Sequence, residues 1–145
     1  MDKEDRMDTI QDPEIFRQEW FRRFVPAERR ELARAVCFPK GDRPAGGSGD
    51  PLWHAFGWRY IACLEGPAAR AAFRRQLGRA RERGEALLVY RERERAVCLW
   101  TPEEAAPEGE PPAFGPDVYI ADTALHWTYA TGDGEKMGPY FARNI

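Results

Sequence analysis

Two histidines, His54 and His126, are the residues of this chain best suited to acid–base chemistry, because an imidazole commonly acts as a general acid or base. Asp122 precedes His126 by four residues across an expected turn, and such a carboxylate can orient an imidazole for base catalysis. Together the three residues indicate an uncharacterised hydrolase as one interpretation. The simpler interpretation makes His54 a structural histidine beside Trp53 and leaves His126 solvated, because neither histidine belongs to a catalytic motif.

The cysteines and the glycine-rich stretch add little to this chemistry. The chain has three cysteines, Cys37, Cys63 and Cys98, which are widely spaced and lie among apolar residues. Their odd number and spacing predict free buried thiols and a reducing, cytoplasmic compartment. Cys63 is the best placed of the three for a nucleophile, because it precedes an expected helix. A zinc site requires about four closely spaced ligands, which are not present, and residues 45–49 lack the Gly-Lys-Ser/Thr ending of a phosphate loop. We therefore expect a non-enzyme without metal, cofactor or catalytic residue.

Arginines dominate the segment from residue 70 to residue 95, where nine arginines and four glutamates leave five surplus positive charges. A helix is expected over residues 67–84, and arginines on one helix face favour contact with nucleic-acid phosphates. The residues expected to make this contact are Arg70, Arg74, Arg75 and Arg79. Nucleic-acid binding is therefore an alternative function. The opposing interpretation is a solvated helix with ion pairs such as Arg79–Glu82.

Protein binding is the leading interpretation, in which the chain is a non-enzymatic interaction module. An acidic arm follows the basic segment and would complement a basic active site on a toxin or an enzyme. Its glutamates are joined by Asp117. The five tryptophans also exceed what a core of this size usually needs, and aromatic residues are enriched at protein contacts. The residues expected to contact the partner are Glu103, Glu104, Glu108, Glu110, Trp53, His54, Trp127 and Tyr129.

Apolar periodicity predicts an α+β fold, with an antiparallel sheet of four or five strands covered on one face by three to four helices. Asp-Pro and Gly-Pro pairs start the helical segments, and β-branched or aromatic residues fill the strands. Helices are expected over residues 13–25, 26–37, briefly from 51, and 67–84. Strands are expected over 58–64, 86–90, 96–100, 118–121 and 125–131, the last with Leu125, Trp127 and Tyr129 on one face. Residues 52–64 also fit a helix, because Leu52, Phe56 and Tyr60 recur at helical spacing. The aromatic segment 138–141 is expected to anchor the C-terminus.

Length and charge indicate one domain over residues 1–145, with a net charge of −2 that opposes attraction of the whole protein to nucleic acid or anionic membrane. Three segments are expected to lack regular structure: the frayed N-terminus 1–11, the flexible loop 39–51 and the acidic, proline-rich loop 101–116. No apolar run is long enough for a membrane span. We expect a cytoplasmic monomer or weak homodimer.

Three groups of residues, taken in order, carry a resemblance. They are Leu52-Trp-His-Ala-Phe56; Cys63-Leu-Glu-Gly66 with Ala69-Arg-Ala-Ala-Phe73; and Asp117-Val-Tyr-Ile-Ala-Asp122 with Trp127-Thr-Tyr129 and Gly138-Pro-Tyr-Phe141. Over residues 52–141 the chain resembles a family of small uncharacterised bacterial proteins, a domain of unknown function, and this resemblance implies no enzymatic activity.

The D-x-x-x-x-W segment, Asp122-Thr-Ala-Leu-His-Trp127, also resembles a strand pair of bacterial immunity proteins, in which Thr-His-Glu often follows the tryptophan strand. The corresponding residues here are Thr131-Gly-Asp-Gly-Glu135, without a histidine, so no role of that histidine carries over. The resemblance implies an immunity-like protein that binds a protein partner.

Overall fold

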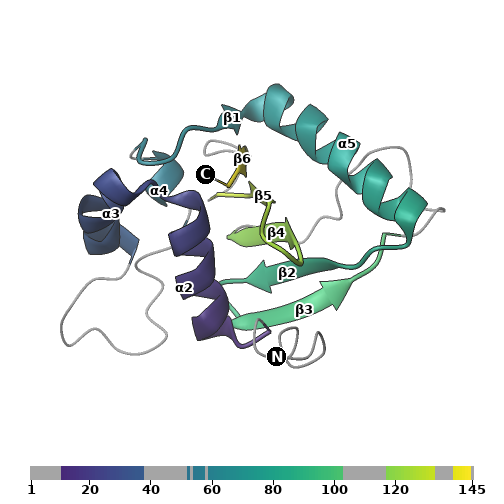
Figure 1. The fold of residues 1–145 in the computed structure, drawn as a ribbon, viewed down its shortest axis with the longest axis horizontal. Helices are drawn as coiled ribbons and strands as arrows, with labels where there is room; N and C mark the ends of the chain where they lie inside the picture. The colour runs from purple at the N-terminus through teal and green to yellow at the C-terminus, as the bar shows by residue number, and fades with distance from the viewer. Residues whose placement is uncertain are drawn as a thin grey trace.

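One antiparallel sheet organises the fold in the computed structural model, which describes residues 11–37, 52, 54–57, 59–102, 117–132 and 139–144 (Figure 1). Within these residues the sheet has six strands in the order β1-β6-β5-β4-β2-β3. Their bounds are β1 Leu64–Glu65, β2 Leu87–Arg91, β3 Ala96–Trp100, β4 Val118–Asp122, β5 Trp127–Ala130 and β6 Tyr140–Arg143. The expected α+β class and the two expected hairpins, β2–β3 and β4–β5, are confirmed.

The sixth strand corrects the expected count of four or five. The C-terminal aromatic segment forms β6, which lies between β5 and β1 and pairs Phe141 with both Tyr129 and Leu64. The expected strand 58–64 is reduced to β1, because Arg59 adopts a positive φ of 61° and its N–H bonds to the Phe56 carbonyl. The segment before β1 therefore turns back on the short helix α4 (His54–Gly57) instead of extending.

The first helical layer is built from an aromatic helix, α2 (Pro13–Phe24). The carboxylate of Asp12 caps this helix by accepting hydrogen bonds from the N–H groups of Glu14 and Ile15, at 2.9 and 3.2 Å. A short 3₁₀ helix η1 (Ala27–Arg29) and helix α3 (Arg30–Cys37) follow it. Apolar residues of α2 pack with α4 and with one face of the sheet in a single cluster.

The second layer is one long helix, α5 (Gly66–Arg83), on the opposite face of the sheet (Figure 1). Phe73 of α5 stacks on Tyr129 of β5, with ring centroids 4.2 Å apart. The expectation of helices on one face only is therefore wrong. The central strands β2, β4 and β5 are buried almost throughout, because both alternating sets of their side chains are apolar.

The start of β5 also departs from the expected alternation. Leu125 has a positive φ of 56°, which reverses the direction of the chain before the strand begins at Trp127. Leu125 consequently packs in the cluster with α2, whereas Trp127 and Tyr129 pack beneath α5.

The expected N-terminal segment 1–11 and the loops 39–51 and 101–116 lie largely outside the described residues. No helix in the described part of the chain is long and apolar enough to cross a membrane.

Candidate functional site

Helix α5 presents arginines to solvent because its other side is fixed to the sheet. Pro67 starts the helix, and Gly84 ends it in the left-handed conformation, with its N–H bonded to the carbonyls of Ala80 and Arg81. A buried stripe holds the helix on the sheet. Its residues are Ala69, Ala72, Phe73, Gln76, Leu77 and Ala80. The positions between these residues necessarily face outward.

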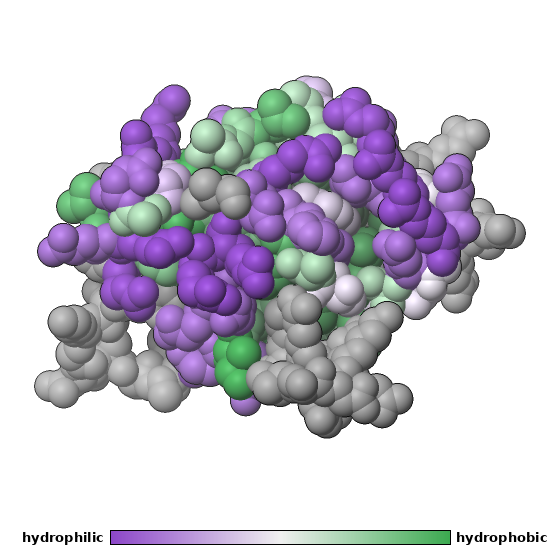
Figure 2. Space-filling view, in the orientation of Figure 1, coloured by the Kyte–Doolittle hydropathy of each residue, from purple (hydrophilic) through white to green (hydrophobic). Residues whose placement is uncertain are grey.

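The arginine face consists of Arg70, Arg74, Arg75, Arg79 and Arg83, all of which are exposed. Figure 2 shows hydrophilic residues along the C-terminal part of α5. All four of the arginines proposed for nucleic-acid contact are thus exposed. At about 100° per residue they spread around the solvent-exposed side of the helix, with Arg70 and Arg74 toward one flank and Arg75 and Arg79 toward the other. Among the described residues Arg79 forms no ion pair, so the expected Arg79–Glu82 pair is absent, and Arg83 lies 3.9 Å from Glu85.

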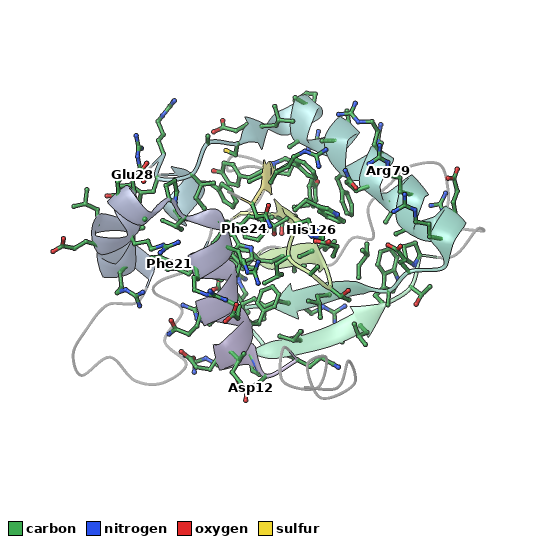
Figure 3. The ribbon with its side chains drawn as sticks, viewed as in Figure 1. Asp12, Phe21, Phe24, Glu28, Arg79 and His126 are labelled. Carbon is green, nitrogen blue, oxygen red and sulfur yellow. The ribbon has the colours of Figure 1, made fainter. Side chains whose placement is uncertain are left out.

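A groove of about 670 Å³ adjoins the arginine face, between the C-terminal half of α5 and the turn that connects β4 to β5. Arg79 and Arg83 belong to both the face and the groove, and Arg143 of β6 lines the groove from the sheet. Figure 3 labels Arg79 on α5 and His126 just before β5. The lining residues are Gln76, Arg79, Ala80, Arg83, Gly84, Glu85, Ala86, Leu87, Asp122, Thr123, Ala124, His126, Trp127 and Arg143.

Asp122 and His126 form a fixed pair at the edge of this groove. One carboxylate oxygen of Asp122 accepts hydrogen bonds from the backbone N–H groups of His126 and Trp127, at 2.6 and 3.2 Å. The other oxygen lies 2.7 Å from Nδ1 of His126, whose side chain is 68% exposed. A proton on Nδ1 would leave Nε2 as the accepting nitrogen. The pair expected from the four-residue spacing is present.

His54 is not part of this arrangement. It belongs to α4, whose residues Ala55 and Phe56 pack in the cluster with α2, on the face of the sheet opposite α5. The side chain of His54 lies outside the described residues. The structure therefore brings together two of the three residues of the hydrolase interpretation.

The expected partner-contact residues are only partly placed. Trp127 and Tyr129 are 5% and 3% exposed and pack beneath α5, so both serve the core instead of an exposed surface. Asp117, expected in the acidic arm, is buried and accepts a hydrogen bond from Nε of Arg93 at 2.6 Å. The other expected contact residues, Glu103, Glu104, Glu108, Glu110, Trp53 and the His54 side chain, lie outside the described residues.

The cysteines differ from the expectation of buried thiols. Cys98 is exposed on β3, and Cys63 is half-buried. Burial, with the nearby charge of Glu65, raises the pKa of the Cys63 thiol to about 11. Cys63 therefore remains protonated and is a poor nucleophile. The side chain of Cys37 is not described.

Sequence reasoning missed a buried carboxylate, Glu92, in the turn between β2 and β3. It forms an ion pair with Arg17 of α2 and accepts hydrogen bonds from the Tyr119 hydroxyl at 2.7 Å and from the Leu52 N–H at 3.1 Å. Burial raises the pKa of Glu92 to about 7, although these three donors favour its ionised form. The charged sequence of the turn Arg91–Arg95 predicts that it is solvated. Nothing local in the sequence indicates that α2 will cover one of its charges.

A family model for a domain of unknown function, DUF4275, matches residues 6–141. The chain belongs to this family. The expected membership in a family of uncharacterised proteins is thereby confirmed, and the match extends beyond the expected residues 52–141 to include the N-terminal helices of the DUF4275 domain. No curated protein and no solved structure matches the chain significantly. In the described part of this DUF4275 domain, no group of three or more His, Cys, Asp or Glu side chains is placed to hold a metal ion.

Proposed function

We propose that this DUF4275 domain is a non-enzymatic protein that binds nucleic acid through the arginine face of α5. The observation that carries the proposal is the exposure of Arg70, Arg74, Arg75, Arg79 and Arg83 on a helix whose opposite stripe is buried in the sheet. A guanidinium group donates paired hydrogen bonds to phosphate oxygens, and its charge persists at any physiological pH.

The dimensions of α5 suit a nucleic-acid strand. The helix rises about 1.5 Å per residue, so Arg70 and Arg83 are separated by about 20 Å along its axis. One strand of a duplex advances about 3.4 Å per nucleotide, and the face therefore matches about six nucleotides. Because the net charge of the protein is −2, the whole protein does not attract a polyanion, and the proposal requires local attraction at this surface.

Neutralising the part of the face farthest from the groove tests the proposal. We expect the triple variant Arg70→Gln, Arg74→Gln, Arg75→Gln to bind a fluorescently labelled 20-nucleotide single strand at least about tenfold more weakly than the wild type, because three phosphate contacts are lost. Fluorescence anisotropy at constant low salt measures the affinity.

The matched control changes the same net charge on the first helical layer. It carries glutamine at the exposed positions Arg22, Arg29 and Arg34. We expect it to bind like the wild type. Equal losses in the two triple variants, or no loss in the α5 variant, would reject the α5 surface.

A second candidate function is protein binding, which one observation favours. Strand β3 forms an edge of the sheet, with β2 as its neighbour, and it exposes Ala96, Cys98 and Leu99, the last at 38%. Exposed apolar edge strands pair readily with strands of other chains. An immunity-like role, with the acidic residues 103–110 facing a basic partner, remains part of this candidate.

Isolation of the tagged protein from its host at physiological salt, with and without nuclease treatment, separates the two candidates. A stoichiometric protein partner that is lost on reversal of the four glutamates would support protein binding. Co-purification of nucleic acid that disappears with nuclease, without any protein partner, would reject it.

A further inference from the structure

Two largely buried side chains in the groove carry polar groups that form no hydrogen bond within the described structure. The side chains of Gln76 and Trp127 are 8% and 5% exposed and line the groove. Neither the Gln76 amide nor the Trp127 indole N–H forms a hydrogen bond with another described residue. Neither is among the fully enclosed polar atoms that lack a partner, so both remain accessible from the groove. Both groups can therefore bond to water or to a ligand that enters the groove.

The surroundings of these two groups are apolar. Leu87, Ala80 and the ring of Trp127 line the groove and are nearly fully buried. Trp127 is held in place, because its ring stacks on Phe141 at 5.8 Å and contacts Phe73 at 6.0 Å. A flat ligand with polar edges would therefore contact a narrow apolar floor beside the two hydrogen-bonding groups.

Cationic side chains surround the same groove. Arg79, Arg83 and Arg143 line it together with two acids, Glu85 and Asp122. Asp122 is engaged by His126 and by two backbone N–H groups, and Glu85 lies 3.9 Å from Arg83. Arg79 and Arg143 form no ion pair with another described residue. The groove thus combines an anion-binding rim with an apolar, hydrogen-bonding interior.

We propose that this groove binds a nucleoside monophosphate unit, with its base in the interior against Gln76 and Trp127 and its phosphate at Arg79 and Arg143. The choice of a nucleotide rests on the proposed function, because Arg79 and Arg83 join the groove to the arginine face of α5. A strand that follows this face would end at the groove, where its terminal nucleotide enters. The Gln76 amide can both donate to and accept from a base edge.

Calorimetric titration of the full-length protein tests the proposal with AMP, CMP, GMP and UMP, and with inorganic phosphate and adenosine as partial ligands. We expect at least one nucleotide to bind about tenfold more tightly than inorganic phosphate. Gln76→Leu should weaken that nucleotide about tenfold and leave phosphate unchanged, because it removes the hydrogen-bonding groups but keeps the volume. Arg143→Gln should weaken both the nucleotide and phosphate.

The Gln76→Leu variant is expected to keep the melting temperature of the wild type, because the amide forms no hydrogen bond with another described residue and leucine has a similar volume. A loss of nucleotide affinity in this variant therefore does not arise from unfolding. Absence of binding by all four nucleotides at about 1 mM would overturn the inference. So would phosphate that binds as tightly as the nucleotides with no effect of Gln76→Leu.

The variant Arg70→Gln, Arg74→Gln, Arg75→Gln separates this inference from the proposed function. It should bind mononucleotides normally, because these arginines do not line the groove. Oligonucleotide binding that depends on them, without any mononucleotide binding, would overturn the groove assignment alone. Mononucleotide binding that depends on Gln76, without oligonucleotide binding, would support the groove and overturn the proposed function.

Discussion

Replacing Glu92 by alanine is expected to destabilise the fold by about 1–3 kcal/mol, most strongly at the acidic end of the pH range, because the groups that bond to this largely buried side chain lose their partner. The charge left behind is that of Arg17, whose side chain is 16% exposed. The substitution also removes the acceptor for the Tyr119 hydroxyl and the Leu52 N–H. Urea unfolding followed by tryptophan fluorescence measures the change in the free energy of unfolding.

Glu94 provides the matched control for this variant, because it lies in the same turn but its side chain is 66% exposed. Glu94→Ala is expected to change the free energy of unfolding by less than about 0.5 kcal/mol. If Glu92→Ala were as mild as the control, the buried pair with Arg17 would not contribute to the fold.

The same carboxylate gives the stability a defined pH dependence. The pKa of Glu92 is raised from 4.5 to about 7, chiefly by burial, so the folded state holds a proton that the unfolded state releases between these values. Its contribution is present below pH 4.5 and is lost as the pH rises to about 7. The free energy of unfolding of the wild type should therefore fall across this window relative to that of Glu92→Gln. Parallel pH profiles for the two proteins would show that Glu92 does not titrate there.

Replacing Trp20 by alanine is the second substitution with a large expected effect, a loss of about 3–5 kcal/mol of stability. The side chain is fully buried where α2 meets the sheet, and its ring contacts Phe24, Phe56 and Tyr119 at centroid distances of 5.5 to 5.6 Å. Its indole N–H donates a buried hydrogen bond of 2.9 Å to Oγ1 of Thr128. The loss combines a large cavity with the loss of this hydrogen bond, although the Thr128 hydroxyl still donates to the Ile120 carbonyl at 3.2 Å. Denaturant unfolding measures the loss.

Thr128→Val isolates the polar part of that effect, because valine keeps the shape and removes the acceptor. We expect a smaller loss of about 1–3 kcal/mol, since the Trp20 N–H is left buried without a partner. A Trp20→Ala variant that unfolds at the same denaturant concentration as the wild type would contradict the placement of α2 on the sheet.

Elements with local sequence signals could be predicted. Helix α5 has a proline at its start, a glycine in the left-handed conformation at its end and an apolar stripe between them, and its exposed arginines follow from that stripe. The hairpin β2–β3 was likewise predicted, because its two apolar runs flank a short charged turn. The Asp122–His126 contact follows from a spacing of four residues across one turn.

Features that depend on distant residues could not be predicted. The pairing of β1 with β6 joins Leu64 to Phe141, which no local pattern indicates. The buried charge of Glu92 requires α2 to cover the turn between β2 and β3. The groove arises only when α5 packs on β5, and this packing gives Gln76, an ordinary helix residue in the sequence, its place among the lining residues.

The salt dependence of oligonucleotide binding is the most direct test of the arginine face. The measurement compares the wild type with the variant Arg70→Gln, Arg74→Gln, Arg75→Gln on one labelled single strand at increasing potassium chloride. Five phosphate contacts should give a slope of log K against log salt of about −3 to −4 for the wild type. The slope for the triple variant should be shallower by about 2, because three of the five phosphate contacts are lost. Absence of binding by the wild type at low salt, or the same slope for both proteins, would contradict nucleic-acid binding by α5.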